Sequence, residues 1–194
     1  MSSYVTLAEF ASYTRDQVAG VDDVVMQAAL DSAEELINDF CQRSFTVAGA
    51  ASARSYSPSN VRSDFLRIHD CTTVTSVTEW GTTLAAAVYQ TEPIISVDWS
   101  GRNGPIEQLR RYATYWAWDY GFPRIVVTAT WGWAATPNAV KEATRIIAKD
   151  ILQQRNNNSG VAGFGEYGAI RVRMNPIAID LLKPLQRQEA FGIA

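Results

Sequence analysis

The sequence predicts an α+β fold. It should combine a small helical bundle, made of the N-terminal helices and a helix at 137–155, with a β-rich insert and a C-terminal strand–helix arm. Apolar residues recur at three- and four-residue steps in 21–45 and again in 137–155, which is typical of amphipathic helices. Between them, residues 44–135 are rich in Ser, Thr, Val, Gly and Pro, with the β-branched and aromatic runs that favour strands. The insert therefore separates two helical parts that we expect to pack together.

Two helices are expected before the insert. Thr6 and Glu9 have capping-box spacing, in which each side chain bonds the backbone amide of the other residue, so a short helix should cover residues 7–13. The long helix that follows begins with Asp22 and Asp23, whose charges suit the positive N-terminal end of a helix. Its core face should consist of Val25, Ala29, Ala33, Leu36, Ile37 and Phe40.

The insert should contain four to six strands between Phe65 and Trp133. Residues 44–64 indicate an exposed connection or weak strands, because turn-forming residues recur there. The stretch 106–123 fits either a short helix or a strand with loops, and loop-forming residues bracket it.

A helix is expected again after the insert. Thr136 is a candidate N-cap and Pro137 takes the first helical position, where a missing amide hydrogen costs nothing. The asparagines and glycine after Arg155 should end this helix. A strand at 169–174 and a short helix from Pro176 follow. The core face of the long helix should consist of Val140, Ala143, Ile147 and Ile151, widened by Ile146 and Leu152.

Four parts are thus expected: the N-terminal helical part at 1–43, the β-rich insert at 44–135, a body helix at 136–159, and a glycine segment with a strand–helix arm at 160–194. No apolar run is long enough to predict a membrane span. The N-terminus lacks the basic and apolar regions of a signal peptide.

Charge is unevenly distributed along the chain. Residues 1–40 contain eight acidic residues and one basic residue, whereas 140–194 contain eight basic and five acidic residues. This asymmetry fits two solvated helix faces, or complementary charge between neighbouring copies or toward a partner. The basic excess is too small and too dispersed to predict direct nucleic-acid binding.

A G-x-G-x-x-G pattern occurs at Gly163, Gly165 and Gly168. A dinucleotide site needs this loop between a strand and a helix, so that the helix N-terminus holds the pyrophosphate. Here the order is reversed, because a helix precedes the loop and a strand follows it. We therefore predict no nucleotide cofactor. Together with Gly160 the three glycines are expected to form a hinge, since glycine permits positive φ angles and close backbone approach.

The residues that best suggest catalysis are His69, Asp70 and Cys71. In a strand, His69 and Cys71 would face one side and Asp70 the other, and a catalytic cysteine usually meets a histidine from elsewhere in the fold. The sequence has one histidine and two cysteines, the other being Cys41, without the spacing of a zinc site. We therefore expect no enzyme, catalytic residue, metal or other cofactor.

Four tryptophans form two W-x-W pairs, Trp116 with Trp118 and Trp131 with Trp133. On a strand, each pair would place both indoles on one face. Core packing is the expected role. A subunit interface and a sugar-stacking platform are the alternatives.

Two blocks of the sequence resemble head-to-tail connector proteins (adaptors) of long-tailed bacteriophages. The first is "YVTLAEFASYTR" with "DDVVMQAALDSAEELINDFCQRSF", and it ends in Cys41, Arg43 and Phe45. The second runs from "VTATWGWAATPNAVKEATRIIAKDILQQRNN" through "GVAGFGEYGAIRVRMNPIAIDLLKPLQR". It matches the family's C-terminal half at Trp131, Gly132, Trp133, Pro137, Val140, Lys141, Ala143, Gly160, Gly163, Gly165 and Gly168. Together the two blocks cover about half of the chain.

The resemblance implies a structural virion protein of the neck, made in the host bacterial cytoplasm. Such adaptors form a ring, usually of twelve copies, under the portal protein. The ring extends the channel through which double-stranded DNA passes without specific binding, and it presents a surface to the next connector or tail component. The alternatives are another connector ring, such as a stopper or tail-completion protein, or a β-rich carbohydrate-binding module.

The resemblance also implies roles for particular residues. Acidic and basic helices would meet between neighbouring subunits, through Asp31, Glu35, Asp39, Lys141, Arg145 and Lys149. The C-terminal arm would reach the portal through Phe164, Tyr167, Ile170, Arg171, Val172, Arg173, Met174, Pro176, Leu181 and Leu182.

Overall fold

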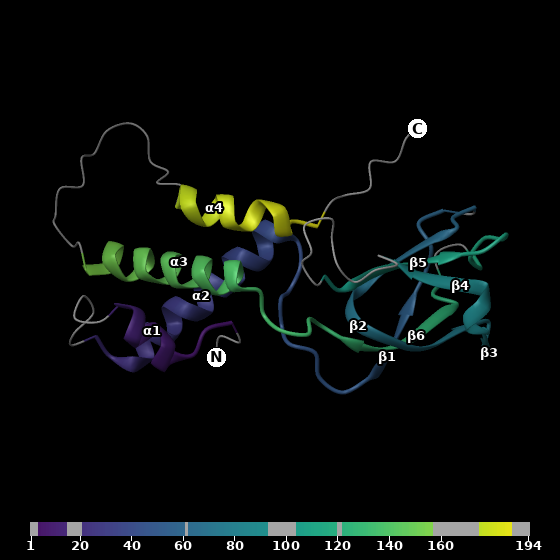
Figure 1. The fold of residues 1–194 in the computed structure, drawn as a ribbon, viewed down its shortest axis with the longest axis horizontal. Helices are drawn as coiled ribbons and strands as arrows, with labels where there is room; N and C mark the ends of the chain where they lie inside the picture. The colour runs from purple at the N-terminus through teal and green to yellow at the C-terminus, as the bar shows by residue number, and fades with distance from the viewer. Residues whose placement is uncertain are drawn as a thin grey trace. The chain divides into compact units, whose positions relative to one another are not determined.

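The computed structural model describes residues 4–14, 21–60, 62–92, 104–119, 122–156 and 175–187, with only the backbone described at 154–156. The chain divides into two compact units (Figure 1). The helical unit comprises Met1–Phe45 together with Thr136–Ala194, and the β unit comprises Thr46–Ala135. Helices and an antiparallel sheet are both present, so the predicted α+β class is confirmed.

The helical unit is built around its third helix, α3 (Asn138–Asn156). Its elements are α1 (Leu7–Thr14), α2 (Asp23–Cys41), α3 (Asn138–Asn156) and α4 (Pro176–Leu182), the last followed by a 3-10 turn, η3 (Lys183–Leu185). Within this unit α3 packs against α1, α2 and α4 (Figure 1).

Side chains cap the first two helices as their sequences indicate. The amide of Thr6 donates to the Glu9 carboxylate at 2.9 Å, and the amide of Glu9 donates to the Thr6 hydroxyl at 3.2 Å. The predicted capping box is therefore confirmed. The backbone bond to Thr6 also holds the pKa of the Glu9 carboxyl below its usual value. In α2 the N-cap is Asp22, which accepts from the amide of Val24 at 2.9 Å.

The buried face of α2 differs from the expected one. Val25, Leu36 and Phe40 are only half-buried. The apolar run of this helix is wide enough to fit several faces, and packing selects the one that meets its neighbours in the fold. The buried residues of α2 are Met26, Ala29, Leu30, Ala33, Ile37 and Cys41. Those of α3 are Val140, Ala143, Thr144, Ile147, Ala148 and Leu152.

The β unit contains one antiparallel sheet in the order β1-β6-β2-β5-β4, with β3 paired to β2 (Figure 1). Five strands are formed by the described residues between Phe65 and Trp133, within the expected number, and β1 lies in the stretch where weak strands were expected. The strands are β1 (Ser52–Tyr56), β2 (Phe65–Glu79), β3 (Thr82–Thr83), β4 (Tyr89–Glu92), β5 (Ile106–Arg111) and β6 (Ile125–Trp131), with a 3-10 turn, η2 (Ala86–Val88), before β4.

The stretch 106–123 is a strand followed by an irregular connection. After β5 the chain is anchored by Trp116, whose side chain is only 2% exposed in the core of the β unit. Its amide donates to the Ser63 carbonyl and its indole N–H to the Asp64 carbonyl, both at 2.9 Å. The adjoining amide of Ala117 donates to the carboxylate of Glu79 at 2.7 Å. These bonds fix a connection whose own sequence carries no helical or strand periodicity.

The two ends of the β unit are joined to each other around Gly132. The amide of Ala48 donates to the Trp133 carbonyl at 2.8 Å, and the amide of Trp133 donates to the Thr46 carbonyl at 2.9 Å. Gly132 has a φ of +117°, and a Cβ there would lie 2.6 Å from the Thr46 carbonyl oxygen. Only glycine fits this conformation and this approach.

Candidate interaction surfaces

The helix α2 presents a row of carboxylates, here called the acidic ladder: Asp31, Glu35 and Asp39. Their spacing of four residues places them on one face. Over this distance the ladder extends about 12 Å along the helix axis. Glu35 and Asp39 are exposed, and neither forms an ion pair within the part of the chain that the structure describes.

The helix α3 presents a matching row of bases, the basic ladder: Lys141, Arg145 and Lys149. Arg145 is engaged within the helical unit, because it pairs with Glu142 at 3.3 Å and lies 5.9 Å from the ring centroid of Tyr13. Lys141 and Lys149 form no ion pair among residues 4–14, 21–60, 62–92, 104–119, 122–156 and 175–187. Each ladder thus retains two unpaired charges of one sign.

The C-terminal segment completes the end of α2. Four carbonyls at the end of α2, those of residues 38–41, need donors from outside the helix. The backbone amide of Gln42 donates to the Asn38 carbonyl, and its side-chain amide donates to the Asp39 carbonyl. The remaining two carbonyls belong to Phe40 and Cys41. They accept from the Gln186 side chain at 3.1 Å and from the Arg187 amide at 2.9 Å. Helix ends leave such carbonyls unsatisfied, so residues 186–187 cap α2 from a distant part of the sequence.

Most of the expected portal arm lies outside the described residues. This holds for all four hinge glycines (Gly160, Gly163, Gly165 and Gly168) and for the arm residues Phe164, Tyr167, Ile170, Arg171, Val172, Arg173 and Met174. Of the other arm residues, Pro176 is exposed at the start of α4, Leu181 is half-buried and Leu182 is fully buried within the helical unit. Ile177, which the sequence analysis did not single out, is the exposed apolar residue of α4.

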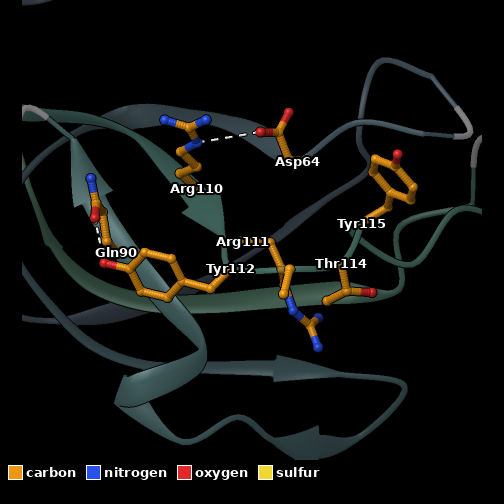
Figure 2. A pocket seen from close by; sticks show the side chains of 8 residues that line it. Asp64, Gln90, Arg110, Arg111, Tyr112, Thr114 and Tyr115 are labelled. Atoms are coloured by element: carbon orange, nitrogen blue, oxygen red, sulfur yellow. Dashed lines mark hydrogen bonds and ion pairs between the residues drawn. The ribbon is translucent and has the colours of Figure 1, made fainter.

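A cavity of about 500 Å³ opens on the β unit, between β4, β5 and the connection after β5 (Figure 2). We call it the tyrosine cavity, because Tyr112 and Tyr115 line it with 48% and 54% of their surfaces exposed. Arg110 pairs with Asp64 at 3.3 Å in the same wall. Arg111 points away from Arg110 and forms an ion pair with Glu79. This cavity was not predicted from the sequence, although "RRYATY" (110–115) joins basic and aromatic residues as binding surfaces do.

The three residues that best suggested catalysis have separate structural contacts. The His69 ring nitrogen Nδ1 lies 2.8 Å from the Tyr56 hydroxyl at the surface. Asp70 is buried and accepts from the Trp133 indole at 3.1 Å. Cys71 is buried too, because register shifts of β2 on either side of it interrupt the alternation expected of a strand. The expected alignment of His69 with Cys71 is therefore not observed.

Both thiols are expected to be inert in the native protein. Burial raises the pKa of Cys41 to about 11 and that of Cys71 to about 12, so at pH 8 little of either is the reactive thiolate. With a thiol-specific chromogenic reagent at pH 8, neither cysteine should react until denaturant is added, after which both should. Rapid labelling of the native chain would contradict this. Increasing reactivity as pH rises above 9 would agree with it.

The tryptophans of the two W-x-W pairs belong mainly to the core. Trp116, Trp131 and Trp133 are buried and Trp118 is half-buried. Core packing, the expected role, is confirmed for the three buried indoles, and they offer no open face to a sugar. The exposed tryptophan of the described β unit is Trp80, in the turn between β2 and β3.

Neither a metal site nor a membrane-spanning helix is found among the described residues. No group of three or more His, Cys, Asp or Glu side chains there is arranged to hold a metal ion. None of the helices there is long and apolar enough to cross a membrane.

No family profile and no curated protein sequence matches the chain. Solved structures do match its fold. A chain in the neck of an empty gene transfer agent (GTA) particle, computed with C6 symmetry, aligns with a TM-score of 0.61 and 16% identity over 97% of this chain and 92% of that chain. A chain in the neck of the native GTA particle, computed with C12 symmetry, aligns with a TM-score of 0.53 and 14% identity over 99% and 98% of the two chains. A chain in the virion of the native GTA particle aligns with a TM-score of 0.57 and 16% identity over 97% of this chain and 92% of that chain. The protein therefore has the fold of GTA neck chains, and at this level the resemblance to head-to-tail connectors is confirmed.

Proposed function

We propose that this protein is a structural component of a virion neck, a head-to-tail adaptor that assembles as a ring under the portal protein. The observation that carries the proposal is the structural match to GTA neck chains, which covers nearly the whole length of both aligned chains. Those necks were computed with six- and twelve-fold symmetry, which supports a homo-oligomeric ring. Twelve copies are proposed, as in the connector family that the sequence resembles.

The acidic and basic ladders are proposed to form the contact between ring neighbours. A closed ring joins two different patches of each subunit, and the ladders supply two patches of equal spacing and opposite charge. Like charges four residues apart on one helix cost about 0.2–0.5 kcal/mol per pair. A neighbour carrying the opposite ladder would remove that cost. Glu35, Asp39, Lys141 and Lys149 are the residues proposed to make these pairs.

Reversing either ladder is expected to prevent assembly, and reversing both is expected to restore it. The acidic variant is Glu35→Lys with Asp39→Lys, and the basic variant is Lys141→Glu with Lys149→Glu. Each alone places like charges at every subunit contact, whereas the fourfold variant again pairs opposite charges. Assembly is measured by analytical ultracentrifugation and by counting rings in electron micrographs. A matched control reverses Asp180, whose side chain is 73% exposed on α4 outside both ladders.

The fourfold variant makes this test specific. Rings that persist in both twofold variants would contradict a ladder interface, and so would a fourfold variant that stays monomeric while it melts like the parent protein. Because the ladders are surface charges, ring formation should also weaken as salt screens them.

The C-terminal segment is proposed to dock on the portal, and the tail side of the ring on the next connector component. Phe164, Tyr167 and the residues 170–174 remain the proposed arm. Leu182 is buried within the helical unit, so in this conformation Pro176 and Ile177 are the exposed apolar residues of α4. The net charge of −3 suits a DNA channel, because unpaired basic residues would bind the passing phosphates.

Electron microscopy of the protein with portal-bearing heads tests the function as a whole. A ring seated at the portal vertex, with the symmetry of the free ring, is the expected result. A protein that binds no head, or that appears only on the tail side of an already closed neck, would overturn the adaptor assignment. The second outcome would favour a different connector ring.

A further inference from the structure

The tyrosine cavity has the size and lining of a ligand site. At about 500 Å³ it falls in the range of roughly 300–1,000 Å³ that is usual for small-molecule sites. Its two tyrosine rings lie apart from each other in the close view (Figure 2). Between them in sequence, Ala113 has a φ of +54°, a backbone conformation that a residue with a side chain rarely adopts. Strain of this kind tends to persist where function requires it.

The Tyr112 ring is held by its own contacts, and the backbone beside Tyr115 is anchored by the next residue. Tyr112 donates its hydroxyl hydrogen to the Gln90 side chain, and its amide donates to the Val88 carbonyl at 3.0 Å. One residue beyond Tyr115, the buried Trp116 anchors the connection to Ser63 and Asp64, just before β2. Rigid aromatic faces bind with little loss of conformational entropy. The Tyr112 wall of the cavity is therefore formed before a ligand arrives.

The charges of the cavity are neutralised within the protein. Arg110 faces Asp64, and Arg111 faces Glu79. A phosphate or a carboxylate would have to compete with these carboxylates, so the lining disfavours an anionic ligand. Hydrogen-bonding capacity nevertheless remains. The Nη groups of Arg110 and the Oδ1 atom of Asp64 make no hydrogen bond to another described residue.

Planar polar groups continue along the same face of the sheet. The Gln90 amide donates to Glu92 at 3.2 Å, and the Gln108 amide donates to the same carboxylate at 2.8 Å. In the register of the sheet, Gln90 pairs with Arg110 and Glu92 with Gln108. A row of amide, carboxylate and guanidinium groups thus extends from the Tyr112 ring.

We propose that the tyrosine cavity binds an uncharged oligosaccharide. A pyranose ring presents C–H groups that pack on the electron-rich face of an aromatic ring, and two exposed tyrosines provide such faces. Its neighbouring hydroxyl groups donate to a carboxylate and accept from a guanidinium, the pair that Asp64 and Arg110 offer. A neutral ligand also suits a cavity whose charges are already paired. The proposal concerns the β unit and does not depend on ring assembly.

Binding is tested on the full chain with immobilised uncharged hexasaccharides of glucose, galactose, mannose and N-acetylglucosamine, alongside sulfated and uronic-acid hexasaccharides. The strongest uncharged hexasaccharide is then titrated in solution by calorimetry. Tyr115→Ala is expected to weaken its binding about tenfold or more, the loss of one stacked ring, whereas Tyr115→Phe should retain it. Tyr13→Ala, an exposed tyrosine of the helical unit, is the matched control and should bind like the parent.

Each other outcome overturns the proposal. These are no uncharged hexasaccharide bound, binding of charged ones alone with strong salt dependence, or equal affinity in Tyr115→Ala. Thermal melting of every variant separates lost binding from lost folding. Ring formation scored on the same samples distinguishes failure of this inference from failure of the adaptor assignment, because Tyr115 lies outside both ladders.

Discussion

Gly132→Ala is expected to destabilise the β unit by at least about 3 kcal/mol. The new Cβ would lie 2.6 Å from the Thr46 carbonyl oxygen and 3.0 Å from the Ala48 backbone. These atoms belong to the paired backbone that closes the unit, so they cannot move away without losing hydrogen bonds. The φ of +117° would be strained for alanine in any case. Urea denaturation followed by tryptophan fluorescence measures the change, since the β unit holds buried indoles.

Gly49→Ala is the matched control for this substitution. A Cβ at Gly49 would have no heavy atom within 4 Å, so its effect should stay within about 0.5 kcal/mol. If Gly132→Ala were as stable as Gly49→Ala, the close approach to Thr46 would not exist in solution.

Trp116→Ala should cost about 3–5 kcal/mol, the usual range for removing a buried tryptophan. The indole fills the core of the β unit, and its N–H satisfies the Asp64 carbonyl. Its loss would leave a cavity and release the connection that carries Tyr112 and Tyr115. The stability of Trp116→Phe should lie between those of the parent and of Trp116→Ala, because phenylalanine keeps an aromatic ring but lacks the N–H donor. Thermal unfolding of the three proteins gives the order.

Trp80→Asn serves as the comparison for the Trp116 variants. Trp80 is 57% exposed and has a φ of +53°, which asparagine tolerates better than tryptophan. This variant should melt at or slightly above the parent temperature, even though Arg124 loses a ring contact at 5.0 Å. A fall as large as that of Trp116→Ala would mean that Trp80 is buried in solution.

Helix boundaries were predicted well because the information is local. The capping box at Thr6 and Glu9 defined the start of α1, and Pro176 marked the start of α4. There the side chain of the preceding Asn175 accepts from the Ile177 amide at 3.0 Å. Such interactions span two to four residues. The exact face of α2 was not predictable, since its wide apolar run needs the neighbouring helices to select the buried side.

The stretch 106–123 could not be assigned from sequence because its partners are distant. Leu109 in β5 pairs with Leu66, and Trp116 bonds to residues 63–64. No pattern within eighteen residues encodes these contacts. For the same reason the tyrosine cavity was missed, since Asp64, Gln90 and Tyr112 meet only after the sheet forms. The W-x-W pairs were the more visible aromatic motif, yet their buried members serve the core.

The two residues that finish α2 are synthesised long after the helix itself, because Gln186 and Arg187 bond to Phe40 and Cys41. The β unit is one uninterrupted segment, Thr46–Ala135, so it can fold as soon as it has left the ribosome. The helical unit needs α3 and then Gln186 and Arg187 before α2 has all its partners. We therefore expect a vectorial order in which the insert folds first and the interrupted helical unit is completed last. Nascent chains that stop before residue 175 should carry a folded insert beside an incomplete helical unit, in which Cys41 lacks its contact with the Leu182 carbonyl at 4.0 Å.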